Sequence, residues 1–172
     1  MSGSNITLIG MPGAGKSTVG VVVAKMLCKS FVDTDLLIQM HSGMKLCEII
    51  DKYGNSAFLK TEGEVISALE LENSVIATGG SVVLSEDAMK HLKEISRVIY
   101  LRASISALRS RLGDLHLRGV VLSEGQTLES LYEERRYLYE KYADVIIDSD
   151  DLSDIHTTAQ RIASRSEGED GL

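Results

Sequence analysis

The sequence predicts an α/β fold with three layers, in which helices cover both faces of a five-stranded parallel sheet. Short apolar runs rich in β-branched residues recur along the chain without polar alternation, at residues 6–9, 31–32, 75–77, 98–101 and 145–147. Amphipathic stretches with helical spacing lie between and after these runs, at residues 16–29, 35–52, 56–72, 85–94, 104–112, 127–142 and 152–163. A glycine-rich turn directly follows the first apolar run.

The apolar runs justify the strands, and their alternation with helices justifies the sheet. Strands that are buried on both faces are apolar throughout, as in a parallel sheet between helices. Because strand and helix patterns alternate, we expect βαβ units with right-handed crossovers. Ligands of such sheets bind beyond the carboxyl ends of the strands. Site residues are therefore expected just after positions 9, 33, 78, 101 and 148.

Length and composition set the broad class of the protein. The 172 residues predict a single domain over residues 1–164, followed by a disordered acidic tail over residues 165–172. A net charge of −7 argues against a broad nucleic-acid-binding surface. No apolar run is long enough to span a membrane, so no membrane partner is expected. Cys28 and Cys47 are expected to be free thiols. With no basic, apolar secretory signal at the start, we expect a cytoplasmic protein that is a monomer.

The turn after the first strand has the pattern of a phosphate-binding loop. Residues 10–18 read Gly-Met-Pro-Gly-Ala-Gly-Lys-Ser-Thr, which fits G-x-x-x-x-G-K-[ST]. Glycines let backbone N–H groups surround a polyphosphate, and the following helix adds the positive end of its dipole. Lys16 is expected to reach the phosphates and Ser17 to bind Mg²⁺. The nucleotide-binding set is thus predicted to include Gly13, Ala14, Gly15, Lys16, Ser17 and Thr18.

Other motifs narrow the class of nucleotide-binding protein. The chain has no N-K-x-D sequence for reading guanine, and it is short for an ATPase motor. A small P-loop kinase that acts on a small molecule with ATP and Mg²⁺ remains. A nucleoside monophosphate kinase would need more arginines to hold two nucleotides.

Two aspartates follow the second predicted strand. Asp33 and Asp35 are two residues apart, so on a strand their side chains share a face. One carboxylate can hold a Mg²⁺-bound water, and the other can accept a proton from an attacking hydroxyl. The alternative is that one of them only caps the next helix.

Two charged residues fall on apolar helix faces. Arg135 lies at the centre of the apolar arc of the helix predicted at residues 127–142, and Glu62 lies among the apolar residues of the preceding helical pattern at residues 56–72. A buried arginine needs an anion, because an unpaired buried charge is costly. Either the two residues pair with each other, or Arg135 meets an anionic group of a substrate that Glu62 helps to orient.

Taken in order along the chain, these motifs resemble the shikimate kinase family. The resemblance covers nearly the whole chain and includes the phosphate-binding loop, Asp33-Thr34-Asp35, Phe58-x-x-x-Glu62, Ala77-Thr78-Gly79-Gly80, Arg111, Arg118 and Glu134-Arg135. It implies a P-loop kinase fold that transfers phosphate from ATP to the 3-hydroxyl of shikimate, a step of aromatic amino acid biosynthesis.

The resemblance also implies roles for individual residues. Lys16 would hold the phosphates, Ser17 and Asp33 would serve Mg²⁺ (Asp33 through water), and Asp35 would bind the reacting hydroxyl. Arg111 would lie near the adenine, and Arg118 would close on the phosphates from a mobile lid at residues 113–125. The alternative interpretation of residues 113–125 is an ordinary surface loop. The substrate set would be Asp35, Glu62, Gly79, Gly80, Ser81 and Arg135, with Arg135 on the substrate carboxylate.

The chain departs from the family pattern at substrate positions. Leu59 stands where the family has an arginine that binds the shikimate carboxylate, and Lys60 is one position away. Ser81 replaces a third glycine, where it could contact substrate or only shape its loop, and Gly119 replaces a proline. Shikimate is the expected acceptor, and a different small hydroxy acid or amino acid such as homoserine is the alternative. An ATP-binding regulator without turnover is the alternative from another class.

Overall fold

The sheet has the predicted five parallel strands. A computed structural model describes residues 5–113, 119–151 and 154–166. The strands are β1 (Asn5–Ile9), β2 (Ser30–Asp33), β3 (Ser74–Ala77), β4 (Ser96–Arg102) and β5 (Val145–Asp148), and their order is β2-β3-β1-β4-β5. In register, Ile6 of β1 lies opposite Val75 of β3 and Arg97 of β4. The carboxyl ends of β1, β2 and β3 therefore meet at one edge of the sheet.

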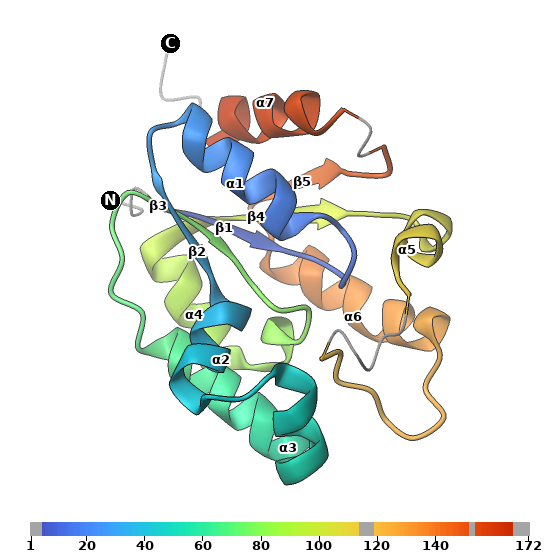
Figure 1. Cartoon of the computed structure of the whole chain (residues 1–172). Helices are drawn as coiled ribbons and strands as arrows, with labels where there is room; N and C mark the ends of the chain where they lie inside the picture. The colour runs from blue at the N-terminus through green and yellow to red at the C-terminus, as the bar shows by residue number, and fades with distance from the viewer. Residues whose placement is uncertain (1–4, 114–118, 152–153, 167–172) are drawn as a thin grey trace.

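Helices on both faces of the sheet complete three layers (Figure 1). The helices are α1 (Lys16–Met26), α2 (Thr34–Ser42), α3 (Leu46–Ser67), α4 (Glu86–Ile95), α5 (Ile105–Arg111), α6 (Leu128–Tyr142) and α7 (Ile155–Ser166). Helices α1 and α7 cover one face of the sheet, and α4 and α6 cover the other (Figure 1). The three-layer α/β prediction is confirmed.

The core explains why the strand sequences are apolar without alternation. Every residue of β1 and β3 is buried, because helices lie against both faces of these central strands. The two outer strands, β2 and β5, are only partly buried. Across the ranges that the structure covers, no helix is both long enough and apolar enough to cross a membrane.

The helix boundaries predicted between residues 35 and 72 are wrong. The stretch predicted as one helix at 35–52 is divided, because Gly43 ends α2 in the left-handed region (φ 67°) and its N–H bonds Gln39 O at 2.8 Å. The second part of that stretch belongs to α3, which continues to Ser67 across a break at Gly54 (φ 83°, ψ 166°). Apolar spacing continues through Gly43, so periodicity alone could not locate that break, whereas the break at Gly54 lies in the gap between the helices predicted at 35–52 and 56–72.

Two shorter elements also differ from the prediction. Residues Val82–Leu84 form a 3₁₀ turn that the sequence analysis did not predict. Helix α7 includes Arg165 and Ser166, so it extends two residues into the predicted tail at 165–172, whose other residues lie outside the described ranges.

Candidate active site

A cavity of about 380 Å³ lies at the carboxyl edge of the sheet, where the parallel fold predicts a ligand site. Its walls come from the loop after β1, Asp35 at the start of α2, the loop after β3 and residues 119–121. Of the predicted site residues, eleven line it: Gly13, Gly15, Lys16, Ser17, Thr18, Asp35, Gly79, Gly80, Ser81, Arg111 and Arg135. The fold thus gathers residues from most of the chain around one space.

The glycine-rich loop takes the conformation its composition predicts. Gly13 (φ 81°) and Gly15 (φ 96°) have positive φ values, and α1 begins directly afterwards at Lys16. The first turn of α1 therefore faces the cavity with its unpaired N–H groups. Ala14 does not line the cavity, because its side chain is fully buried behind the loop.

Lys16 folds back over this loop. Its Nζ donates hydrogen bonds to Gly10 O at 2.7 Å and Met11 O at 2.9 Å. Burial lowers the pKa of Lys16 to about 8, although the nearby carboxylates of Asp35 and Asp33 oppose that change. A phosphate at the loop would supply the full counter-charge that this ammonium group lacks.

Asp33 has two hydrogen-bond partners, one on each carboxylate oxygen. Its Oδ1 accepts from the backbone N–H of Asp35 at 3.0 Å and so caps α2, while its Oδ2 accepts from Ser17 Oγ at 2.6 Å. Asp33 can therefore cap α2 with one oxygen and contact the phosphate-binding loop with the other. The two oxygens suit Mg²⁺, which prefers oxygen ligands and keeps several waters. Among the residues placed by the structure, no three His, Cys, Asp or Glu side chains cluster as a metal cage.

Asp35 and Glu62 present unused oxygens to the same point. Asp35 Oδ1 and Glu62 Oε1 are buried and have no hydrogen-bond partner in the described structure. A Cβ added to Gly79 would lie 2.7 Å from the first and 2.6 Å from the second, so only glycine leaves room for both. Burial raises the pKa of Asp35 to about 6, with a further contribution from Asp33. Burial likewise raises the pKa of Glu62 to about 7, against a hydrogen bond from Ser81 that lowers it.

Arg135 is buried, as its place on the apolar helix face predicts. It is 1% exposed, its Nη2 donates to Val121 O at 2.9 Å, and its Nε has no hydrogen-bond partner among the described residues. Glu62 is equally buried, but the part of the chain that the structure describes has no hydrogen bond or ion pair between the two residues. The interpretation that they pair structurally is therefore not what the fold displays. Arg135 lines the cavity, and no hydrogen bond or ion pair joins it to a carboxylate of the described residues.

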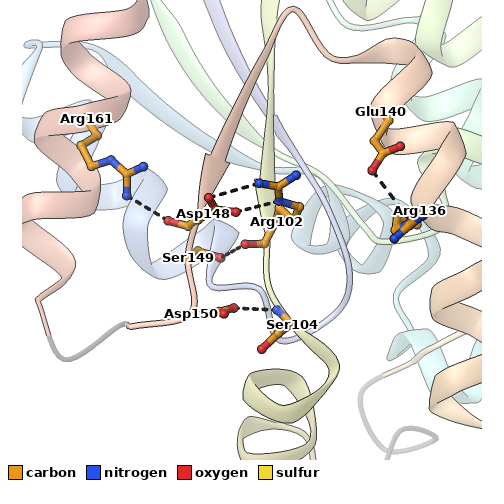
Figure 2. A network of polar contacts seen from close by, with 8 residues as sticks. All are labelled: Arg102, Ser104, Arg136, Glu140, Asp148, Ser149, Asp150 and Arg161. Atoms are coloured by element: carbon orange, nitrogen blue, oxygen red, sulfur yellow. Dashed lines mark hydrogen bonds and ion pairs between the residues drawn. The ribbon is translucent and has the colours of Figure 1, made fainter.

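Arg111 joins three segments beside the phosphate loop. Its guanidinium donates to Gly13 O at 3.4 Å, to Ser149 O at 2.8 Å and to Asp150 O. Figure 2 shows how the chain after β5 is held against β4 and α5: Arg102 pairs with Asp148, Ser149 Oγ donates to Arg102 O, and Asp150 accepts from the Ser104 N–H. Arg118 and most of the predicted lid residues before 119 lie outside the described residues, so their predicted roles stay predictions.

Sequence reasoning missed several residues around the cavity. Tyr139 Oη donates a 2.6 Å hydrogen bond to Gly80 O, although the sequence placed this tyrosine only in the apolar arc of α6. Its position four residues after Arg135, on the same helix face, was the available clue. Phe58, Thr78, Val120 and Val121 line the cavity. Phe58 and Thr78 belong to motifs that the sequence analysis quoted without assigning these two residues a role. No local pattern marks Val120 and Val121, because the tertiary fold alone brings them there.

The departures from the family pattern can now be located. Leu59 packs against a small apolar cluster that includes Phe58 and Val121, whereas Lys60 is 77% exposed and lies 3.8 Å from Glu64. Lys60 therefore does not replace the missing arginine. Gly119 has φ 66°, which proline cannot adopt, and an added Cβ would lie 2.4 Å from Leu46 Cβ.

Comparison with known proteins agrees with this geometry. The family model "Shikimate kinase" matches residues 12–166. The chain is 41% identical over 152 residues to the shikimate kinase of Thermodesulfovibrio yellowstonii, covering 87% of each protein. It is 37% identical over 155 residues to that of Coxiella burnetii, again covering 87% of each.

Solved structures give the same result. Shikimate kinase from Acinetobacter baumannii in complex with shikimate superposes with a TM-score of 0.86 at 30% identity, covering 94% of this chain and 91% of that one. Shikimate kinase from Aquifex aeolicus superposes with a TM-score of 0.81 at 31% identity, covering 95% and 96%. With a family match over most of its length and relatives at this identity, the chain belongs to the shikimate kinase family, a family of ATP-dependent small-molecule kinases.

Proposed function

We propose that this chain transfers the terminal phosphoryl group of ATP to the 3-hydroxyl of shikimate and forms shikimate 3-phosphate for aromatic amino acid biosynthesis. The observation that carries the proposal is one cavity lined by a phosphate-binding loop, the carboxylate of Asp35 and the buried cation of Arg135. Family membership and the related structure that contains shikimate support it. The loop would bind the phosphate donor ATP, Asp35 would act as the base, and Arg135 would bind the carboxylate of the substrate.

The nucleotide side of the cavity would be formed by residues 13–18 together with Arg111. The loop N–H groups and Lys16 would hold the phosphates once Lys16 exchanges its two carbonyl partners for phosphate oxygens. Ser17 and Asp33 would hold Mg²⁺, Asp33 through water, and the ion when bound neutralises phosphate charge. Arg118 keeps its predicted role of closing on the phosphates.

The acceptor side would be formed by Asp35, Glu62, Gly79, Gly80, Ser81 and Arg135. Asp35 Oδ1 would accept the proton of the attacking hydroxyl, since this oxygen is buried without a partner and the carboxylate is ionised at neutral pH. Arg135 would bind the substrate carboxylate with its guanidinium group, whose Nε has no hydrogen-bond partner in the described structure. The protein thus contributes positioning and charge, which suffices for phosphoryl transfer.

The decisive experiment is coupled ADP release with Mg-ATP and a panel of acceptors: shikimate, quinate, homoserine, threonine and gluconate. Efficient turnover of shikimate is expected. Turnover of a different acceptor would show that the Leu59 replacement marks a changed substrate within the family. ATP binding without turnover on the whole panel would favour a nucleotide-binding regulator.

We further propose that residues 1–164 act as one kinase domain and that the protein is a monomer. The sheet supports a single domain, because β1 lies between β3 and β4 and so joins early and late parts of the chain. Sedimentation of the purified protein measures its oligomeric state, and a dimer would contradict the second proposal.

A further inference from the structure

Glu62 is a deeply buried carboxylate with little compensation. It is 1% exposed, and its Oε1 has no hydrogen-bond partner. Its Oε2 accepts a 2.7 Å hydrogen bond from Ser81 Oγ, the one protein donor that the described structure gives this carboxylate. Buried charges ordinarily have a paired cation or several donors. The orientation of Glu62 therefore depends heavily on one serine.

That serine belongs to a loop that is held from two sides. Ser81 is itself 5% exposed and connects the loop after β3 to α3 through Glu62. On the other side, Tyr139 of α6 donates to Gly80 O at 2.6 Å. Directly before these two anchored residues lies Gly79, the residue against which the unused oxygens of Glu62 and Asp35 converge.

We infer that Ser81 is a positioning residue of the acceptor site, whose hydroxyl fixes the Glu62 carboxylate so that Oε1 faces Gly79 and Asp35. Ser81 lines the cavity, and in this role it acts through Glu62. The inference rests on the proposed function for its catalytic consequence, but the hydrogen bond itself can be tested without any acceptor.

The charges around Glu62 predict what the loss of this hydrogen bond would do. The ionisable groups that face Glu62 are Asp35 at the start of α2, Lys16 on α1 and Arg135 on α6. Burial and Asp35 raise the pKa of Glu62, while Ser81, Arg135 and Lys16 lower it. Removing the serine hydroxyl takes away a donor that favours the charged form, so the pKa of Glu62 must rise above about 7.

The experiment compares Ser81→Ala, Glu62→Gln and the double variant with the unaltered enzyme. In Ser81→Ala, the acid limb of the pH profile of kcat/KM for shikimate should move to higher pH, and KM for shikimate should rise several-fold while KM for ATP stays constant. In the Glu62→Gln background, the same serine change should leave the acid limb where it is, because no carboxyl group remains at position 62 to respond. An equal shift in both backgrounds would overturn the inference.

Ser85→Ala provides the matched control. Ser85 is a hydrogen-bonded serine too, but its hydroxyl accepts from the Ala88 N–H, caps α4 and does not line the cavity. This change should lower the melting temperature without moving the acid limb. A limb shift of the same size in Ser85→Ala would show that Ser81 has only a structural effect.

Unfolding measurements separate this inference from the proposed function. If the unaltered protein does not phosphorylate shikimate, the proposed function fails. The coupling between Ser81 and Glu62 is then measured by denaturant unfolding of the four proteins, which form a double-mutant cycle, at several pH values without ligand. Because Glu62 has a raised pKa when folded, its charge lowers stability as pH rises through the range between 4.5 and about 7. Ser81→Ala should extend that decline to higher pH, and Glu62→Gln should abolish the extension. Additive effects in the cycle would refute the Ser81–Glu62 coupling, even where Glu62→Gln is inactive.

Discussion

The hydroxyl of Ser17 donates a 2.6 Å hydrogen bond to Asp33 Oδ2, and so joins the first turn of α1 to the carboxyl end of β2. These residues are distant in sequence, yet the parallel pairing of β2 with β3, and of β3 with β1, brings the two strand ends to one edge. The contact places a hydroxyl and a carboxylate beside the phosphate-binding loop. It also leaves the other Asp33 oxygen to cap α2.

Asp33→Asn should raise the Mg²⁺ concentration needed for half-maximal turnover by roughly 10- to 100-fold, the range found for residues that support a bound metal. Asparagine is a good helix cap, so the bond to the Asp35 N–H can survive while the charge is lost. A Mg²⁺ titration of ADP release measures the effect. Asp87→Asn, an exposed change in the first turn of α4, is the control. Unchanged Mg²⁺ dependence in Asp33→Asn would argue against a role near the metal.

Asp35→Asn should lower kcat by about 10²-fold or more, because a positioned base is removed. In the unaltered enzyme, kcat should fall as pH decreases through about 6, where Asp35 takes up a proton. A steady-state pH profile tests both statements. Turnover close to normal in Asp35→Asn would show that another group accepts the proton.

The same substitution should stabilise the fold. Raising the Asp35 pKa from 3.8 to about 6 means that the folded state disfavours the ionised carboxylate, by on the order of 3 kcal/mol. This cost develops as pH rises from 3.8 to about 6 and is complete at pH 7. Asp35→Asn should therefore unfold at higher denaturant than the unaltered protein at neutral pH, with the advantage lost at acid pH. Lower stability at pH 7 would contradict the sign.

Arg135→Lys should raise KM for the acceptor by roughly tenfold or more and leave KM for ATP unchanged. Lysine keeps the charge but lacks the planar fork that binds a carboxylate through two hydrogen bonds. Arg136→Lys is a matched control, since Arg136 is the next residue on α6 but is exposed and lies 3.9 Å from Glu140. Equal effects of the two changes on acceptor KM would exclude the anchor role of Arg135.

Leu59→Arg should lower KM for shikimate by roughly tenfold, as expected from an added carboxylate-binding arginine. Leu59 adjoins an apolar cluster that shares Phe58 and Val121 with the cavity, so the new side chain starts beside the acceptor. Lys60→Arg, on the exposed neighbour, is the control. If Leu59→Arg keeps the fold, by circular dichroism, but loses activity, the cavity binds a different acceptor.

Two tyrosines that stack on each other should respond differently to loss of their hydroxyls. The rings of Tyr100 and Tyr139 lie 5.1 Å apart, but Tyr139 Oη bonds Gly80 O, whereas Tyr100 Oη is buried without a partner in the described structure. Tyr139→Phe should lower the free energy of unfolding by about 1 kcal/mol and raise acceptor KM. Tyr100→Phe should be neutral or stabilising, because it removes an unpaired polar group. Urea unfolding of both variants provides the comparison, and equal destabilisation would contradict it.

Much of the architecture could be predicted from local patterns. The five apolar runs located the strands, and the glycine-rich turn located the phosphate-binding loop with Lys16 at the start of α1. Helical spacing alone placed Arg135 and Glu62 inside the protein, and both are 1% exposed. The break at Gly43 was missed, because a single left-handed glycine interrupts a helix without disturbing apolar spacing, while the break at Gly54 lies between two predicted helices.

The sequence by itself determined which residues are buried and which turn can bind phosphate, because burial follows spacing along one element and the loop is a local backbone conformation. Only the tertiary structure decided which buried groups meet. Glu62 accepts a hydrogen bond from Ser81 and forms none with Arg135 in the described structure. Tyr139 donates a hydrogen bond to Gly80 O. Lys60 is exposed, whereas its neighbour Leu59 packs against an apolar cluster. Those contacts join side chains from separate elements, and the packing of helices on the sheet sets their distances. The spacing of residues along the chain therefore cannot predict the distances between side chains of separate elements.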